Sequence, residues 1–122
     1  MGVENNECVI ATTWNADAFN SIRKWVDTLN PKYQTLFAFL PSLINHKQTI
    51  ILGPDGSKKG WDLAKKGELL RDSFIKKIKE FDYEDGSSPF NFVEVGYGEF
   101  GQKILRGNNV NCYSNAEYEE AK

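Results

Sequence analysis

The segment from residue 62 to residue 81 most constrains the fold, because its apolar residues recur at the spacing of one helix face. Leu70, Phe74, Ile78 and Phe81 form an apolar line along this segment, while its lysines occupy positions suited to solvent. A helix with one apolar face must bury that face against another element. The pattern therefore predicts a surface helix over residues 62–81 that packs against a sheet or a second helix.

Strand-like segments supply the surface that this helix needs. Segments rich in β-branched, aliphatic and aromatic residues cover 7–14, 47–53, 90–98 and 102–107, and the last two are joined by a glycine-bearing turn as in a hairpin. A second amphipathic helix is predicted within residues 15–30, before Pro31. Residues 33–40 fit either a short helix or a strand, and their aromatic content favours a strand.

In chain order these segments predict an α+β (or α/β) domain. The expected architecture is a single sheet of four or five strands with two main helices packed on one face. A chain of 122 residues fits one globular domain that covers residues 1–122. Its polar ends, about 1–6 and about 114–122, are expected to fray.

Composition limits the classes of partner. A formal net charge of -2 provides no overall field for nucleic acid or an anionic membrane, and no apolar run is long enough to span a bilayer. Cys8 and Cys112 lie far apart without a C-x-x-C pattern, which indicates neither a metal site nor a redox pair and leaves open whether they form a disulfide. We therefore expect a soluble cytoplasmic protein without membrane, metal or cofactor.

A G-x-G-x-x-G spacing at Gly96, Gly98 and Gly101 raises the possibility of a nucleotide-binding loop. Such a loop needs a following helix whose N-terminus faces the phosphates. The residues that follow here, 102–107, are strand-like. The spacing therefore predicts a plain bulged hairpin rather than a nucleotide site.

The loop at residues 53–61, "GPDGSKKGW", is the stronger candidate for binding. Its glycines allow backbone amides to converge on an anion, two lysines add charge, and a tryptophan offers a flat apolar face. Lys58 stands where a phosphate-loop motif requires glycine, so the match to that motif fails. The alternative is a surface turn that leads into a helix. The predicted binding residues are Asp55, Gly56, Ser57, Lys58, Lys59, Gly60 and Trp61.

Residues 46–100 also resemble a family of small hypothetical proteins. In that pattern P-D-G-S-K and a following Gly-Trp open a helix, and a W/F-V-E-V strand comes later; this chain has "PDGSKKGW" and "FVEV" at those places. The resemblance implies no activity and no catalytic residues.

These observations favour a small binding or regulatory domain that engages a protein partner or a small anionic ligand through the 53–61 loop. One alternative is a small hydrolase that uses His46, the single histidine, as general base with a carboxylate partner. Another is a structural or inhibitory interaction protein without a pocket.

Overall fold

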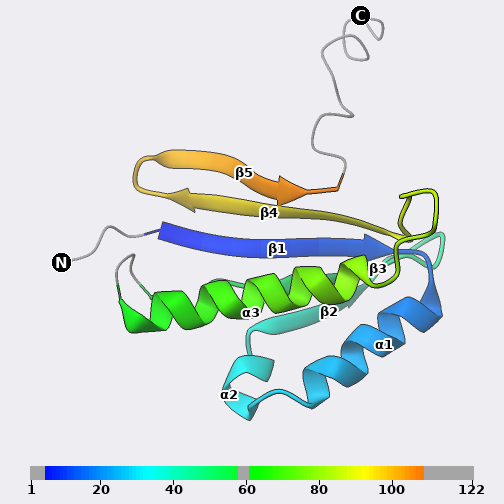
Figure 1. The fold of residues 1–122 in the computed structure, drawn as a ribbon, viewed down its shortest axis with the longest axis horizontal. Coiled ribbons are helices and arrows are strands. Elements are labelled where there is room, and N and C mark those ends of the chain that lie inside the picture. Colours follow the sequence, from blue (N-terminus) through cyan, green and yellow to red (C-terminus); the bar gives the residue numbers. More distant parts are fainter. Residues whose placement is uncertain (1–4, 58–60, 109–122) are drawn as a thin grey trace, which may run out of the picture.

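The computed structural model describes residues 5–57 and 61–108, and the fold within them is α+β. The elements, in chain order, are β1 (Asn5–Thr13), α1 (Ala16–Asp27), α2 (Pro31–Gln34), β2 (Phe37–Pro41), β3 (Gln48–Leu52), α3 (Asp62–Lys79), β4 (Phe90–Gly98) and β5 (Gly101–Gly107). The strands form one five-stranded antiparallel sheet in the order β2-β3-β1-β4-β5, and α1 and α3 lie side by side over one of its faces (Figure 1). The predicted fold class is confirmed.

The core lies between this face and the helices. Strand pairing places Val9 of β1 beside Leu52 of β3 and Ala11 beside Ile50 and Phe92, and all five side chains are buried. Successive strand residues point to opposite faces, so this alternation assigns one face of every strand to the helices. Each helix adds a buried apolar stripe, with Phe19, Ile22 and Val26 from α1 and Leu70, Phe74, Ile75 and Ile78 from α3. The α3 helix ends at Lys79, earlier than predicted, so Phe81 packs against the core from just beyond it.

Residues 33–40 divide between the two structures that the sequence allowed. Pro31–Gln34 form the single turn α2, where the Asn30 side chain accepts a hydrogen bond from the Lys32 amide, and Phe37–Pro41 form β2. The strand that the aromatic content favoured is therefore present, but it begins only at Phe37. Pro31 begins α2 because its ring suits a first helical position, where an amide hydrogen has no intrahelical partner.

Cys8 is a free, buried thiol on β1. Burial raises the pKa of this thiol above its ordinary value, the charge of Glu94 raises it further, and Arg71 partly opposes both. Cys112 lies outside the described residues, as do most of the N-terminal end and all of the C-terminal tail that the sequence predicts to fray. Within the described part of the chain, no helix is both long and apolar enough to cross a membrane.

Phe74 on α3 is fully buried, and its ring joins the helices to the sheet. It stacks on Trp25 of α1 with ring centroids 6.3 Å apart and meets Phe37 of β2 edge to face at 5.3 Å. We expect Phe74→Ala to lower the free energy of unfolding by about 3–5 kcal/mol, because it removes the buried ring and leaves a cavity. Urea denaturation measures this loss, and Leu69→Ala, at a position of α3 that is 65% exposed, is the matched control with an expected change within about 0.5 kcal/mol. Equal losses in the two variants would contradict this account of the core.

Candidate functional site

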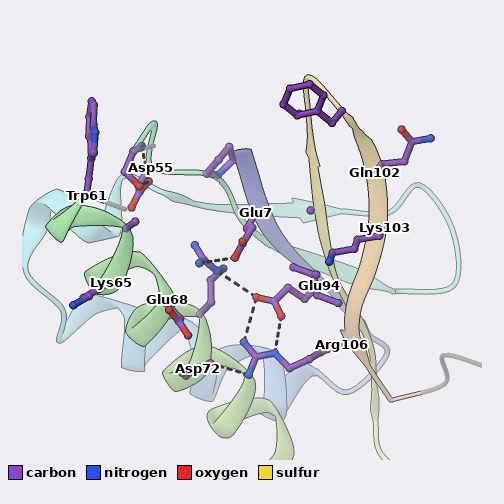
Figure 2. A pocket seen from close by; sticks show the side chains of 18 of the residues that line it. Glu7, Asp55, Trp61, Lys65, Glu68, Asp72, Glu94, Gln102, Lys103 and Arg106 are labelled. Atoms are coloured by element: carbon purple, nitrogen blue, oxygen red, sulfur yellow. Dashed lines mark hydrogen bonds and ion pairs between the residues drawn. The ribbon is translucent and has the colours of Figure 1, made fainter. Parts of the chain in front are cut away.

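A groove of about 900 Å³ lies beside the sheet, between the N-terminal half of α3 and the β4–β5 hairpin. Its lining comes from β1, the 53–57 loop, α3, β4, the hairpin turn and β5. Figure 2 shows Trp61 and Lys65 on the α3 wall and Lys103 on the β5 wall, while the side chain of the neighbouring Gln102 points away from α3. The groove thus brings described residues of the 53–61 stretch together with the glycine-bearing hairpin, the two segments that the sequence singled out.

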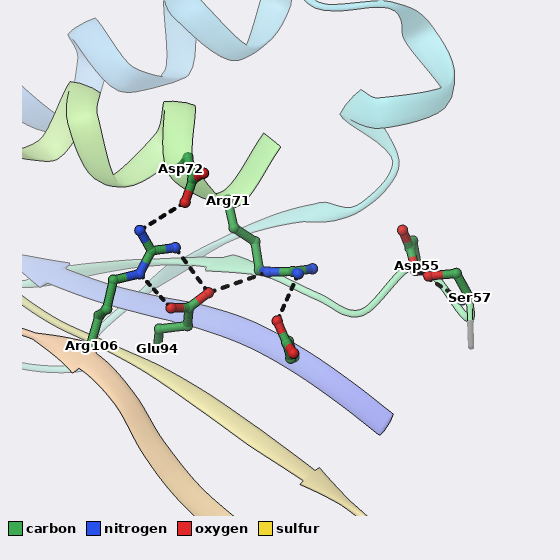
Figure 3. A network of polar contacts seen from close by, with 7 residues as sticks. Asp55, Ser57, Arg71, Asp72, Glu94 and Arg106 are labelled. Atoms are coloured by element: carbon green, nitrogen blue, oxygen red, sulfur yellow. Dashed lines mark hydrogen bonds and ion pairs between the residues drawn. The ribbon is translucent and has the colours of Figure 1, made fainter. Parts of the chain in front are cut away.

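The floor of the groove contains a buried carboxylate, Glu94 of β4, whose residue is only 3% exposed. Arg106 of β5 donates two hydrogen bonds to it, from Nε to Oε1 at 2.6 Å and from Nη2 to Oε2 at 3.2 Å. Arg71 of α3 approaches the same carboxylate, with Nε 3.2 Å from Oε2 (Figure 3), although this N–H is not aligned for a hydrogen bond. Two guanidinium groups therefore compensate one buried negative charge.

The same two arginines extend the network to the walls. Arg71 Nη2 lies 2.7 Å from Glu7 Oε2 on β1, and Arg106 Nη1 lies 2.7 Å from Asp72 Oδ1 on α3. The hydrogen bonds that Arg106 donates to Glu94 are the main cause that raises the pKa of its guanidinium above the usual range. The interaction of Arg106 with Asp72 raises this pKa further. The network ties α3 to three adjacent strands, and both arginines already have carboxylate partners.

The 53–57 loop is held by its own side chains. Asp55 Oδ1 accepts hydrogen bonds from the Ser57 amide at 2.8 Å and from Ser57 Oγ at 2.6 Å, and the Gly53 amide donates to the Leu36 carbonyl at 2.8 Å. The Asp55 carboxylate also contacts the helix at Gly67 of α3. A Cβ atom at this position would lie only 2.5 Å from Asp55 Oδ2, which is closer than the two atoms can approach. Gly67 therefore lets the loop lie directly on the helix.

The structure brings together three of the seven predicted binding residues: Asp55, Ser57 and Trp61 line the groove. Gly56 is at an exposed turn with φ 82° and does not line it. Lys58, Lys59 and Gly60 lie outside the described residues. Because Asp55 occupies the Ser57 amide, that amide is not free to bind an anion as the glycine-rich sequence of the loop suggested.

The hairpin contributes a wall for which the sequence predicted no role. Gly101, at φ 116°, adopts a conformation that favours glycine, and beside it Phe100 projects with 85% of its surface exposed. Across the groove Trp61 is 46% exposed. Each wall therefore carries one aromatic ring that is largely outside the core.

The rim of the groove carries charges of both signs. Lys65 and Glu68 belong to α3, and Glu99 and Lys103 belong to the hairpin. None of these four side chains forms an ion pair within residues 5–57 and 61–108. In contrast to the arginines of the floor, they are available to a ligand.

Sequence reasoning missed Glu7, Arg71, Glu94 and Arg106, which form the floor of the groove. One signal was present: Glu94 stands in "FVEV" on the same face as Phe92, at a position where alternation requires a core residue. A charged residue at a core position needs partners of opposite charge. The sequence alone does not say which of the chain's arginines supply them.

His46 does not belong to this site. It lies in the exposed turn between β2 and β3 at φ 51° and does not line the groove. No side-chain hydrogen bond or ion pair joins it to any other described residue. Among residues 5–57 and 61–108, the geometry therefore offers the hydrolase alternative no carboxylate that orients a histidine base. In the described part of the chain, no group of three or more His, Cys, Asp or Glu side chains is arranged to hold a metal ion.

Comparisons with protein-family models, with curated proteins and with solved structures found no match for this chain. The resemblance of "PDGSKKGW" to small hypothetical proteins consequently adds no function to the groove, whose role has to be inferred from its geometry.

The Glu94 network makes a prediction about stability. We expect Arg71→Met to lower the free energy of unfolding by about 3–5 kcal/mol, because it leaves the Glu94 carboxylate with one of its two compensating charges and removes the partner of Glu7. Urea denaturation tests this, with Lys77→Met as control, since Lys77 forms an exposed ion pair with Glu80 at 3.7 Å whose loss should cost within about 0.5 kcal/mol. A loss below about 1 kcal/mol for Arg71→Met would contradict the role given to this network.

The contact between Asp55 and Gly67 predicts a coupling between loop and helix. Alanine normally stabilises a helix interior by about 0.5–1 kcal/mol relative to glycine, but here its Cβ would displace the Asp55 carboxylate. We expect Gly67→Ala to destabilise the wild type and to destabilise an Asp55→Ala background less, where only Arg71 Nη1, 3.2 Å from the added Cβ, still has to shift. A double-mutant cycle measured by urea denaturation gives the coupling energy, and additive effects would show that the loop does not press on Gly67.

Proposed function

We propose that this protein is a small cytoplasmic binding domain, and that the groove between α3 and the β4–β5 hairpin receives a short extended segment of a protein partner. The volume of about 900 Å³ is within the range of ligand-binding clefts. The free buried thiol of Cys8 is compatible with a reducing compartment.

The observation that carries this proposal is the pair of exposed rings on opposite walls, Trp61 and Phe100. Aromatic side chains bury a large area at little cost in conformational entropy, and they dominate the energetics of many protein interfaces. A phenylalanine that is 85% exposed at a hairpin turn gains nothing from the core of its own domain. Trp61 and Phe100 flank one groove, where their rings can contact the apolar side chains of a bound segment.

The charges support a peptide segment over a small anion. The rim offers two lysines and two glutamates without ion-pair partners among the described residues, and a peptide can carry groups that complement both signs. The guanidinium groups of the floor already face carboxylates, so an anion would have to compete with Glu7, Asp72 and Glu94. The small anionic ligand that the loop sequence suggested would depend on Lys58 and Lys59, which lie outside the described residues.

Selection from a phage library of random peptides tests the proposal. We expect peptides enriched on the wild type to bind it with micromolar affinity and to bind Trp61→Ala or Phe100→Ala at least about 10-fold more weakly, because each variant removes one aromatic anchor. Binding is measured by fluorescence anisotropy of labelled peptides.

Trp14→Ala is the matched control, because Trp14 is 58% exposed and does not line the groove. Its affinities should match the wild type within about 2-fold. Failure to enrich any peptide, or equal loss of affinity in Trp14→Ala, would argue against the groove as a peptide site. Binding of inorganic phosphate to the wild type that disappears in a Lys58→Ala, Lys59→Ala double variant would instead support the small-anion alternative.

A further inference from the structure

The sheet has a second face that the helices of the described residues do not cover, and its composition differs from that of the rest of the chain. Strand pairing assigns to this open face the side chains of Asn6, Cys8, Ile10 and Thr12 on β1, Ala38 and Leu40 on β2, Thr49 and Ile51 on β3, Asn91, Val93, Val95 and Tyr97 on β4, and Gln102 and Ile104 on β5. None of these side chains is charged, although 26% of the residues in the chain are Asp, Glu, Lys or Arg. The helix-covered face, by contrast, includes Glu7, Glu94 and Arg106.

The open face is also apolar at its centre and exposed at its edges. Ile10, Ile51 and Val93 lie side by side across three neighbouring strands and are half-buried. Further out, Leu40 on β2 is 47% exposed and Ile104 on β5 is 54% exposed. Apolar patches with a polar, uncharged rim often mark surfaces that contact another protein.

We propose that two copies of this protein associate through their open faces to form a two-fold symmetric dimer. At a two-fold axis each residue meets the same region of an identical surface, so any charge near the axis would face its own like charge. A surface without charged side chains avoids that repulsion. Nucleic acid or an anionic membrane would require cationic groups on this face, and the described strands place none there.

The available area agrees with a weak dimer. The five strands contain 9, 5, 5, 9 and 7 residues. At about 3.4 Å along a strand and about 4.8 Å between strands, they present roughly 550 Å² per copy. Two such faces would bury about 1,100 Å², just below the range of stable interfaces and within that of weak, transient ones. Face-to-face packing of two twisted sheets about 10 Å apart is a common arrangement in β-sandwiches.

Sedimentation equilibrium over a range of concentrations tests the dimer. We expect the average mass of the wild type to rise from 13.9 kDa towards twice that value as the concentration passes through the micromolar range. Val93→Lys at the centre of the open face and Ile104→Lys near its edge should each raise the dissociation constant at least about 30-fold, because each would bury an unpaired charge. Ile104 is exposed in the monomer, so its variant should fold even if Val93→Lys does not; circular dichroism checks both.

Leu69→Lys on α3 is the matched control, since Leu69 is also largely exposed but lies on the helix layer. It should dimerise like the wild type. A wild type that stays monomeric at about 300 µM would overturn the proposal and leave the open face to a different partner. Dissociation caused by Leu69→Lys but not by Ile104→Lys would also overturn it, because the interface would then involve the helices.

Discussion

The groove depends on one buried carboxylate. Glu94 lies on the helix-covered side of β4, where its neighbour on β1 is the apolar Val9, and a negative charge at that depth is tolerated only with close positive partners. Arg106 reaches it from the adjacent strand, and Arg71 reaches it from the helix above. Each arginine has a second carboxylate partner, Glu7 for Arg71 and Asp72 for Arg106. One charge at a core position thus organises side chains on four elements.

This network and the aromatic core divide the space between α3 and the sheet. Towards the C-terminal half of α3, Phe74 packs on Trp25 and Phe37, and apolar burial holds the helix close. Near the middle of α3, Arg71 stands at this interface in place of an apolar side chain and reaches Glu7 of β1 and Glu94 of β4. The groove lies where these charged residues interrupt an otherwise apolar interface.

Periodicity predicted much of this fold because burial follows it closely. The line of Leu70, Phe74 and Ile78 gave the helix and its buried face, and the alternation in residues 90–98 gave β4. The site was harder to predict because it depends on distances between elements. Glu7, Arg71 and Arg106 are ordinary charged residues in the sequence, and only strand order and helix placement bring them to Glu94. The turn at residues 53–57 was recognised from its chemistry, but the Asp55–Ser57 hydrogen bonds use an amide that an anion would have needed.

The two faces of the sheet support two interactions that need not interfere. Glu94 and Arg106 project towards α3 and the groove, whereas Val93 and Ile104, one or two positions away on the same strands, project to the uncharged open face. Because neighbouring strand residues alternate between faces, a substitution at Val93 changes the open face without removing a groove side chain. A segment bound between Trp61 and Phe100 would therefore leave the open face available to a second copy. In such a dimer the two grooves would lie on the outer surfaces of the pair, where each could take its own ligand.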